Sequence, residues 1–337
     1  MYTVLGQEKA IATIQQAISV GRNHHAWIFS GPRGVGKCAT AIEFAKQILE
    51  TTKDPAAHPD LHIIRKEDVT WSQNPSLQKK KQTNIPLDLL RERIIGGKTS
   101  DDRVHDATVF KTPVLGKNKV FIIDEAELLD APGQNALLKT LEEPPSGTTI
   151  ILVTSTDDLL LPTIHSRCNL VSFAPLASGV MQSWSENADL GVSPSELVWL
   201  MSFAGGSPGL VCEAIEANLP ELASDLDSFL TLSTNNYGVA VQKIVSFAES
   251  FVADKLKQNS SASKEAANRR AGELLLCMFG SAAQSLIRNG YIEEGVAATT
   301  ILSDIEKQFS TNISMKVLLE SLAARWAYQC AGDSVFM

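Results

Sequence analysis

The chain has 337 residues, which is more than one ordinary domain needs and suits two or three. Hydrophobic residues make up 44% of the chain and charged residues 20%, as in a globular protein with ample core material, and no apolar run is long enough to cross a bilayer. The net charge of −8 argues against a protein that coats nucleic acid by bulk electrostatic attraction.

Two further classes of protein are disfavoured by the sequence. Residues 1–9 lack the basic and apolar stretches of an export signal, so we expect a cytoplasmic chain with no membrane partner. The five cysteines are widely scattered and form no C-x-x-C pair, so we expect neither a disulfide framework nor a zinc site.

The first motif along the chain is a phosphate-binding loop at residues 31–38. Its residues, Gly-Pro-Arg-Gly-Val-Gly-Lys-Cys, fit the pattern G-x-x-x-x-G-K-[ST] through the lysine. Residues 26–29 are apolar and predict a strand that enters the loop, and residues 39–46 predict a helix that leaves it. This strand–loop–helix setting is the context that the motif requires, so a glycine-rich turn without function is the weaker interpretation.

The residue types in this loop predict nucleotide binding with poor support for hydrolysis. Gly31, Gly34 and Gly36 would let backbone N–H groups converge on phosphate oxygens, and Lys37 would bridge the terminal phosphates. Cys38 stands where a hydroxyl normally binds Mg²⁺, and sulfur is a poor ligand for that hard cation. We therefore expect ATP to bind without turnover, and Mg²⁺ to bind weakly or not at all.

The segment that follows is less regular. Residues 66–84 are polar and include a proline, which predicts an exposed excursion, and the lysines at 79–81 favour a solvated loop. Residues 87–95 have the spacing of a short helix that ends at two glycines. Residues 98–118 predict another loop before the next strand.

An acidic pair forms the second motif. Residues 120–123 are apolar and β-branched, as in a buried central strand, and Asp124 and Glu125 follow directly. In nucleotide hydrolases of this architecture the first acid holds Mg²⁺ and the second polarises the attacking water. Two plainer interpretations are that the acids cap the following helix, and that Lys37 is a leftover base paired with Asp124.

The order of the elements predicts the fold class. Up to residue 173 strand-like and helix-like runs alternate, which predicts an α/β domain with a mainly parallel sheet, and residues 149–153 are another central strand. Beyond this domain the spacing of apolar residues is helical to the end of the chain. We expect three domains: a P-loop domain at 1–173, a small helical lid at 174–235 and a helical bundle, or collar, at 236–337.

The third motif is a short turn at residues 162–168 that contains Arg167. An arginine in such a turn can pair with a carboxylate of its own domain. It can also project across a subunit boundary and stabilise charge on a neighbour's nucleotide, as an arginine finger. The residues alone favour the first of these roles.

Two runs of the sequence carry a resemblance to a known family. Residues 135–145 (Asn-Ala-Leu-Leu-Lys-Thr-Leu-Glu-Glu-Pro-Pro) and 166–168 (Ser-Arg-Cys) resemble the clamp-loader branch of the AAA+ ATPases. The resemblance implies that Arg167 is an arginine finger that acts in trans on an adjacent subunit. It also implies that the acidic pair belongs to the nucleotide site, with Thr154 or Ser155 as its polar sensor.

Within that family the sequence discriminates between two subunit types. The motor subunits, gamma and tau, typically end the P-loop with Lys-Thr or Lys-Ser and carry a sensor arginine after Gly-Ser in the lid. Here Cys38 occupies the first position and Pro208 the second, within a run at 204–209 (Ala-Gly-Gly-Ser-Pro-Gly) that resembles the turn of delta-prime subunits. The resemblance therefore implies a subunit of the delta-prime type, with Glu125 idle in its own site.

This resemblance also implies partners. The chain would be one member of a hetero-oligomer with the motor gamma or tau subunits and the delta subunit, which loads the sliding clamp of DNA polymerase III onto primed DNA. Contacts with DNA would be modest and directed at the backbone, given the acidic balance. Two alternatives stay open: an ATP-hydrolysing motor subunit of the gamma/tau type, and a P-loop kinase of small molecules, which the long helical half disfavours.

Overall fold

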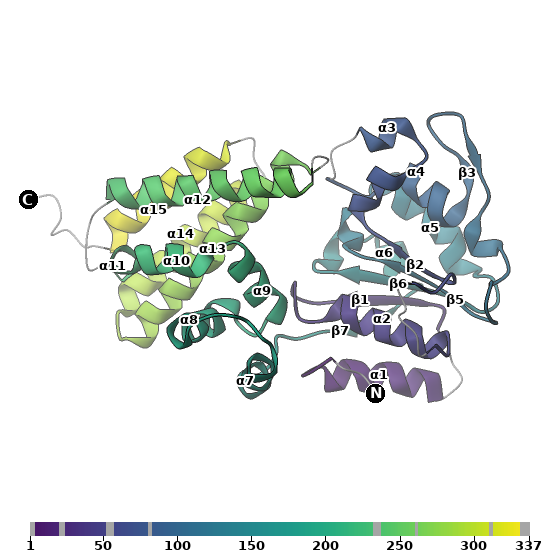
Figure 1. The fold of residues 1–337 in the computed structure, drawn as a ribbon, viewed down its shortest axis with the longest axis horizontal. Helices are drawn as coiled ribbons and strands as arrows, with labels where there is room; N and C mark the ends of the chain where they lie inside the picture. The colour runs from purple at the N-terminus through teal and green to yellow at the C-terminus, as the bar shows by residue number, and fades with distance from the viewer. Residues whose placement is uncertain are drawn as a thin grey trace, which may run out of the picture. The chain divides into compact units, whose positions relative to one another are not determined.

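The computed structural model describes seven stretches of the chain, namely residues 4–19, 24–51, 57–79, 83–231, 237–259, 262–309 and 313–330. The chain divides into two compact units (Figure 1). The first unit holds residues 1–189 and 206–209, and the second holds residues 190–205 and 210–337. The division into three domains stays a prediction, and its boundary between residues 235 and 236 lies outside the described residues.

A five-stranded parallel sheet forms the centre of the first unit, in the strand order β2-β5-β6-β1-β7. Its strands are β1 (Ala26–Ser30), β2 (Leu61–Ile64), β5 (Lys119–Ile123), β6 (Thr148–Thr154) and β7 (Asn169–Ser172). Every residue of the three inner strands is buried, because helices cover both faces of the sheet. This arrangement confirms the predicted α/β fold with a parallel sheet.

The two faces of the sheet have separate apolar cores. On one face, alternate strand residues such as Ile28, Phe121 and Ile150 pack in a cluster with helix residues such as Leu137. On the other face, Trp27 and its neighbours on β1 pack against an aromatic ring of the helix that follows the P-loop. The helices of the first unit are α1 (Glu8–Ser19), α2 (Lys37–Ile48), α3 (Pro75–Gln78), α4 (Leu87–Leu90), α5 (Ala131–Glu142), α6 (Pro162–His165) and α7 (Ser178–Asn187).

The irregular segment before β5 packs more tightly than the sequence indicated. The prediction of an exposed excursion over residues 66–84 was wrong for its described part, since a 3₁₀ helix at Lys66–Trp71 and α3 bury Val69 and Leu77 in the core. Two apolar side chains in a polar stretch are enough to anchor a short helix, and they give no clear periodicity. Residues 80–82 of this prediction lie outside the described residues.

The next part of this segment follows the prediction more closely. The helix over 87–95 is α4 followed by a π-helical turn at Arg91–Ile95, and it ends at Gly96 with a positive φ of 69°. The expected loop contains a small antiparallel pair and one 3₁₀ turn. These elements are β3 (Gly97–Lys98), β4 (Val104–His105) and the turn Thr108–Phe110.

The described residues of the second unit form helices joined by short connections. The helices are α8 (Pro194–Ala204), α9 (Pro208–Glu216, from its third residue on), α10 (Leu219–Asp225), α11 (Asp227–Leu230), α12 (Tyr237–Gln258), α13 (Lys264–Arg288), α14 (Ile292–Gln308) and α15 (Met315–Cys330). The buried rings of Phe279 and Trp326 meet edge to face, 4.8 Å apart, where α13 and α15 pack. Of the helices described, none combines the length and apolar character that crossing a membrane would need.

Candidate nucleotide-binding site

The P-loop has the conformation that its glycines predict. Strand β1 ends at Ser30, helix α2 begins at Lys37, and the residue before it, Gly36, has a left-handed φ of 101°. At Gly31, φ is 147°, and an added Cβ would lie 2.2 Å from the carbonyl oxygen of Phe173. Both positions therefore require glycine, because no L side chain fits them without strain.

Lys37 lies inside the loop. Its Nζ donates hydrogen bonds to the carbonyl oxygens of Gly31 at 2.5 Å and Pro32 at 2.6 Å, and it lies 3.4 Å from the Oγ of Ser155. Burial lowers the pKa of this amine to about 8, an effect that the negative charges of Glu127 and Asp124 partly oppose. The amine is therefore charged near neutral pH, and it can exchange loop carbonyls for phosphate oxygens.

Other carbonyls of the loop accept hydrogen bonds from residues outside the loop. Gln7 donates to the loop through its side-chain amide at 3.0 Å, Ser207 through its hydroxyl at 2.8 Å and Gly209 through its backbone N–H at 2.9 Å. Their acceptors are, respectively, the carbonyl oxygens of Val35, Arg33 and Gly34. The first turn of α2 holds the carbonyl of Gly36. The carbonyls of residues 33–36 thus all have partners within the chain.

The acidic pair, Asp124 and Glu125, lies next to a basic pair, Arg65 and Lys66, which follows the neighbouring strand β2. Strands β2 and β5 run parallel with Ile64 opposite Ile123, so the residues after each strand also lie together. Arg65 Nε is 3.4 Å from Asp124 Oδ2, and its Nη2 is 3.9 Å from the Sγ of Cys38. The sequence motifs predicted one acid and one thiol here, and the structure adds a guanidinium that contacts both.

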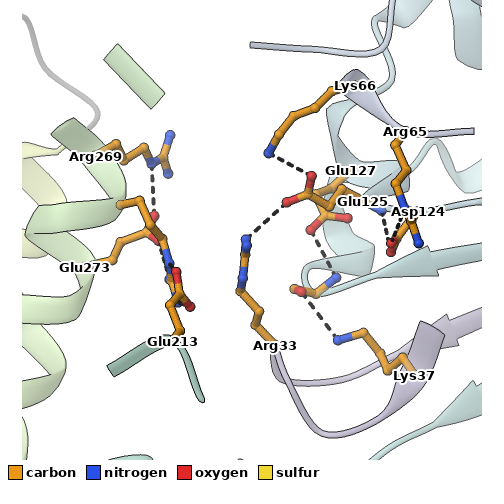
Figure 2. A network of polar contacts seen from close by, with 12 residues as sticks. Arg33, Lys37, Arg65, Lys66, Asp124, Glu125, Glu127, Glu213, Arg269 and Glu273 are labelled. Carbon is orange, nitrogen blue, oxygen red and sulfur yellow. Dashed lines mark hydrogen bonds and ion pairs between the residues drawn. The ribbon is translucent and has the colours of Figure 1, made fainter. Parts of the chain in front are cut away.

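Glu125 is held by two cations. Its carboxylate contacts Arg33 Nη1 at 3.1 Å and Lys66 Nζ at 2.7 Å, as Figure 2 shows. The backbone of Glu125 is left-handed, with φ of 54°, which is strained for a residue with a side chain. Strained backbone conformations cluster at functional sites, and here the strain accompanies a carboxylate that is already paired.

The polar residues after β6 divide between two roles. Thr154 is buried, and its hydroxyl accepts a hydrogen bond from the N–H of Thr156. Ser155 faces Lys37, and its N–H donates to Glu127 at 3.1 Å. Of the two sensor candidates, Ser155 is therefore the one that contacts the P-loop lysine.

The residues present do not fit Mg²⁺. The cation prefers oxygen ligands, but Cys38 offers sulfur, and burial together with the charge of Asp124 raises the pKa of its thiol to about 11. The carboxylate of Asp124 is already paired with Arg65, and no ion pair between Asp124 and Lys37 occurs among the residues described. Nowhere in the described stretches do three or more His, Cys, Asp or Glu side chains converge as a metal site would require.

Arg167 lies at the surface after α6, away from the P-loop motif in sequence. Its guanidinium donates to Glu142 at 2.8 Å, to the carbonyl of Thr163 at 2.8 Å and to the Ser166 hydroxyl at 2.9 Å. The side chain is 31% exposed, and its carboxylate partner is 47% exposed. The guanidinium is thus oriented by its own domain but is not buried in it.

Sequence patterns assigned no role to four charged residues of the site: Arg33, Arg65, Lys66 and Glu127. Arg33 and Glu127 belong to the two motifs, at positions that the patterns leave variable. The basic pair follows a strand that sequence patterns did not predict. Alignment of the two apolar runs Leu-His-Ile-Ile and Val-Phe-Ile-Ile as paired parallel strands is the signal that locates it.

Comparisons with known proteins agree with the motifs. A family model described as DNA polymerase III, delta subunit, matches residues 6–177. DNA polymerase III subunit gamma/tau of Mycobacterium tuberculosis (strain ATCC 25618 / H37Rv) is 32% identical over 209 residues, which are 61% of this chain and 34% of that protein. DNA polymerase III subunit tau of Salmonella typhimurium is 36% identical over 172 residues, which are 49% of this chain and 24% of that protein. The chain thus matches about a third or less of the length of these relatives.

A gamma subunit-related protein of Thermotoga maritima covers 94% of this chain and 99% of its own, with a TM-score of 0.49 and 16% sequence identity.

Proposed function

Because the chain belongs to the DNA polymerase III delta subunit family, we propose that it is the delta-prime subunit of a bacterial clamp loader. In this role it helps to load the sliding clamp onto primed DNA. It supplies Arg167 as an arginine finger to the ATP of a neighbouring motor subunit and does not hydrolyse ATP itself.

One observation carries this proposal: the acids that hydrolysis needs are already paired within the chain. A glutamate that polarises the attacking water must present a free carboxylate to it. Glu125 instead contacts Arg33 and Lys66, and Arg65 occupies the carboxylate of Asp124. With a thiol at Cys38, the site has the loop that binds phosphate but lacks an arrangement that activates water.

The position of Arg167 supports a role in trans. Its ion pair with Glu142 joins two partly exposed side chains, and such surface pairs contribute at most about 1 kcal/mol to stability. An arginine finger accelerates phosphoryl transfer by about 10³–10⁵-fold. The contact with Glu142 can therefore orient the guanidinium and be exchanged for a triphosphate at little cost.

The proposal includes partners and a location. The relatives are named as gamma/tau subunits, so the neighbours proposed here are motor gamma or tau subunits, together with delta and the sliding clamp. The complex would act in the cytoplasm. Its contacts with primed DNA would be to the phosphate backbone, since a net charge of −8 disfavours extensive binding.

Reconstitution tests the role of Arg167. The full chain is assembled with motor and delta subunits in which only the motor site adjacent to this chain keeps an intact P-loop. Arg167→Ala should lower ATP hydrolysis at that site by about 10³-fold and abolish clamp loading. The control Arg103→Ala removes an equally charged, 48% exposed side chain of the same unit and should change neither rate. Unchanged hydrolysis in the Arg167→Ala complex would reject the finger.

A motor subunit of the gamma/tau type is the second candidate. The names of the relatives favour it, as does the retention of Lys37 and all three loop glycines. It requires Mg²⁺-dependent ATP turnover by the isolated chain, and Glu125→Gln should abolish that turnover. Absence of ATP turnover in both the natural chain and the Glu125→Gln variant favours the delta-prime role.

A further inference from the structure

The basic pair after β2 and the acidic pair after β5 match each other residue by residue. Ile64 lies opposite Ile123, and the N–H of Asp124 donates to the carbonyl of Ile64 at 3.0 Å. The next residues on the two strands are Arg65 and Asp124, which form one ion pair. After them Lys66 pairs with the following acid, at 2.7 Å.

These two cations supply the charge that a divalent metal would supply. Arg65 and Lys66 bring two positive charges to the two negative charges of the acidic pair. Around them lie two more cations, Arg33 and Lys37, and one more acid, Glu127. Of these seven side chains four are positive and three are negative, so cations of the chain balance the acids of the two motifs without any metal.

The contacts of Arg65 leave its guanidinium able to bind a ligand. A guanidinium has five N–H donors, and the contacts of this one with Asp124 and Cys38 are long, at 3.4 Å and 3.9 Å respectively. The side chain is 46% exposed, so it can turn toward a phosphate oxygen and keep its contact with Asp124. The carbonyls of Arg33, Gly34 and Val35 are held by residues other than Lys37, so these contacts can persist when Lys37 turns to a phosphate.

We propose that Arg65 and Lys66 replace the divalent cation in this site, which binds a nucleoside di- or triphosphate as the metal-free anion. Lys37 and the loop contact the phosphates on one side. Arg65 contacts them from the side of Asp124 and Cys38, where the metal lies in hydrolysing enzymes. The ligand then stabilises the subunit without being consumed. This inference goes beyond the proposed function, which holds whether or not nucleotide binds here.

Equilibrium binding of fluorescently labelled ATP to the full chain tests the proposal, in excess EDTA and in excess Mg²⁺. The affinity in EDTA should equal or exceed that in Mg²⁺. Arg65→Gln should weaken binding in EDTA by about tenfold, the effect of one charge-assisted hydrogen bond, and Arg65→Lys should retain most of it. The control Lys111→Ala removes a positive charge from the loop before β5, at the end of that strand opposite to the acidic pair. It should leave the affinity for ATP unchanged.

A reversal experiment separates replacement of the metal from simple attraction. The double variant Cys38→Thr with Arg65→Gln restores a hydroxyl and frees Asp124, so its binding should depend on Mg²⁺, in contrast to the natural chain. Circular dichroism verifies that each variant is folded, and the EDTA comparison on the natural chain needs no variant.

Three outcomes would overturn the inference. They are a requirement for Mg²⁺ in the natural chain, tighter binding after Arg65→Gln, which would mean that the arginine blocks the site, and no binding of nucleotide in either condition. The last outcome leaves the proposed function intact, because that function is measured separately through Arg167 and its neighbour's ATP.

Discussion

The buried amine of Lys37 should make the proposed affinity for nucleotide dependent on pH. Its pKa is about 8 instead of the ordinary 10.5, because removal of the amine from water disfavours the charged form more than Glu127 and Asp124 favour it. Below this pKa the amine is charged and able to pair with phosphate, and above it the amine is neutral. Raising the pH through this range should therefore weaken binding.

The size of the effect follows from the protonated fraction. With a pKa of about 8, roughly nine tenths of the amines are charged at about pH 7 and roughly one tenth at about pH 9. If only the charged form binds, the apparent affinity falls in proportion to that fraction, about tenfold over this interval. The phosphates themselves change little here, since their last proton leaves near pH 6, and any residual change would strengthen binding.

Titration of labelled-ATP binding in EDTA across this pH interval measures the effect. Lys37→Arg is the matched control, because a guanidinium stays charged throughout and should give a flat profile. A natural chain whose affinity is constant, or increases with pH, would show that the amine is not the group that binds phosphate in its charged form.

Three other perturbations address the loop and the helical unit. The thiol of Cys38, with a pKa of about 11 instead of 9.0, should be alkylated about a hundredfold more slowly than free cysteine near neutral pH, by mass spectrometry of the labelled chain, and equal rates would contradict its burial beside an acid. Gly31→Ala places a methyl 2.2 Å from a carbonyl oxygen and should lower the free energy of unfolding by about 2 kcal/mol or more, whereas Gly238→Ala, with nothing within 4 Å, should not lower it. Arg270→Ala breaks a two-point ion pair with Glu213 in which both side chains are less than a fifth exposed, and it should cost about 3 kcal/mol in urea unfolding; a change under about 0.5 kcal/mol would mean that the pair is solvated.

The inner strands were predictable from the sequence, whereas the edge strands were not. Strands β1, β5 and β6 are apolar throughout because both of their faces are buried. The edge strands β2 and β7 are partly exposed and carry polar residues such as His62 and Asn169, so neither strand has a clear pattern. Their place in the sheet depends on pairing with neighbours that are distant in the chain, which local patterns do not record.

The candidate site divides in the same way. The P-loop glycines, Lys37 and the acids could be predicted. Each lies in one of two motifs that are continuous in sequence, and the spacing within each motif reflects local geometry. Arg65 reaches the site through strand register, and Ser207 through a turn far along the chain. A prediction of either one requires the sheet order first, so the charge balance of the site became visible only in the structure.

The donors that fasten the P-loop have a consequence for where the chain can be cut. They come from both ends of the first unit, at Gln7 and at Ser207 and Gly209, whereas the match to the family ends at residue 177. A fragment trimmed to the family match would leave the carbonyls of two consecutive loop residues without their protein partners and open to water. The smallest piece that preserves these contacts thus extends some thirty residues past the end of the family match, to residue 209.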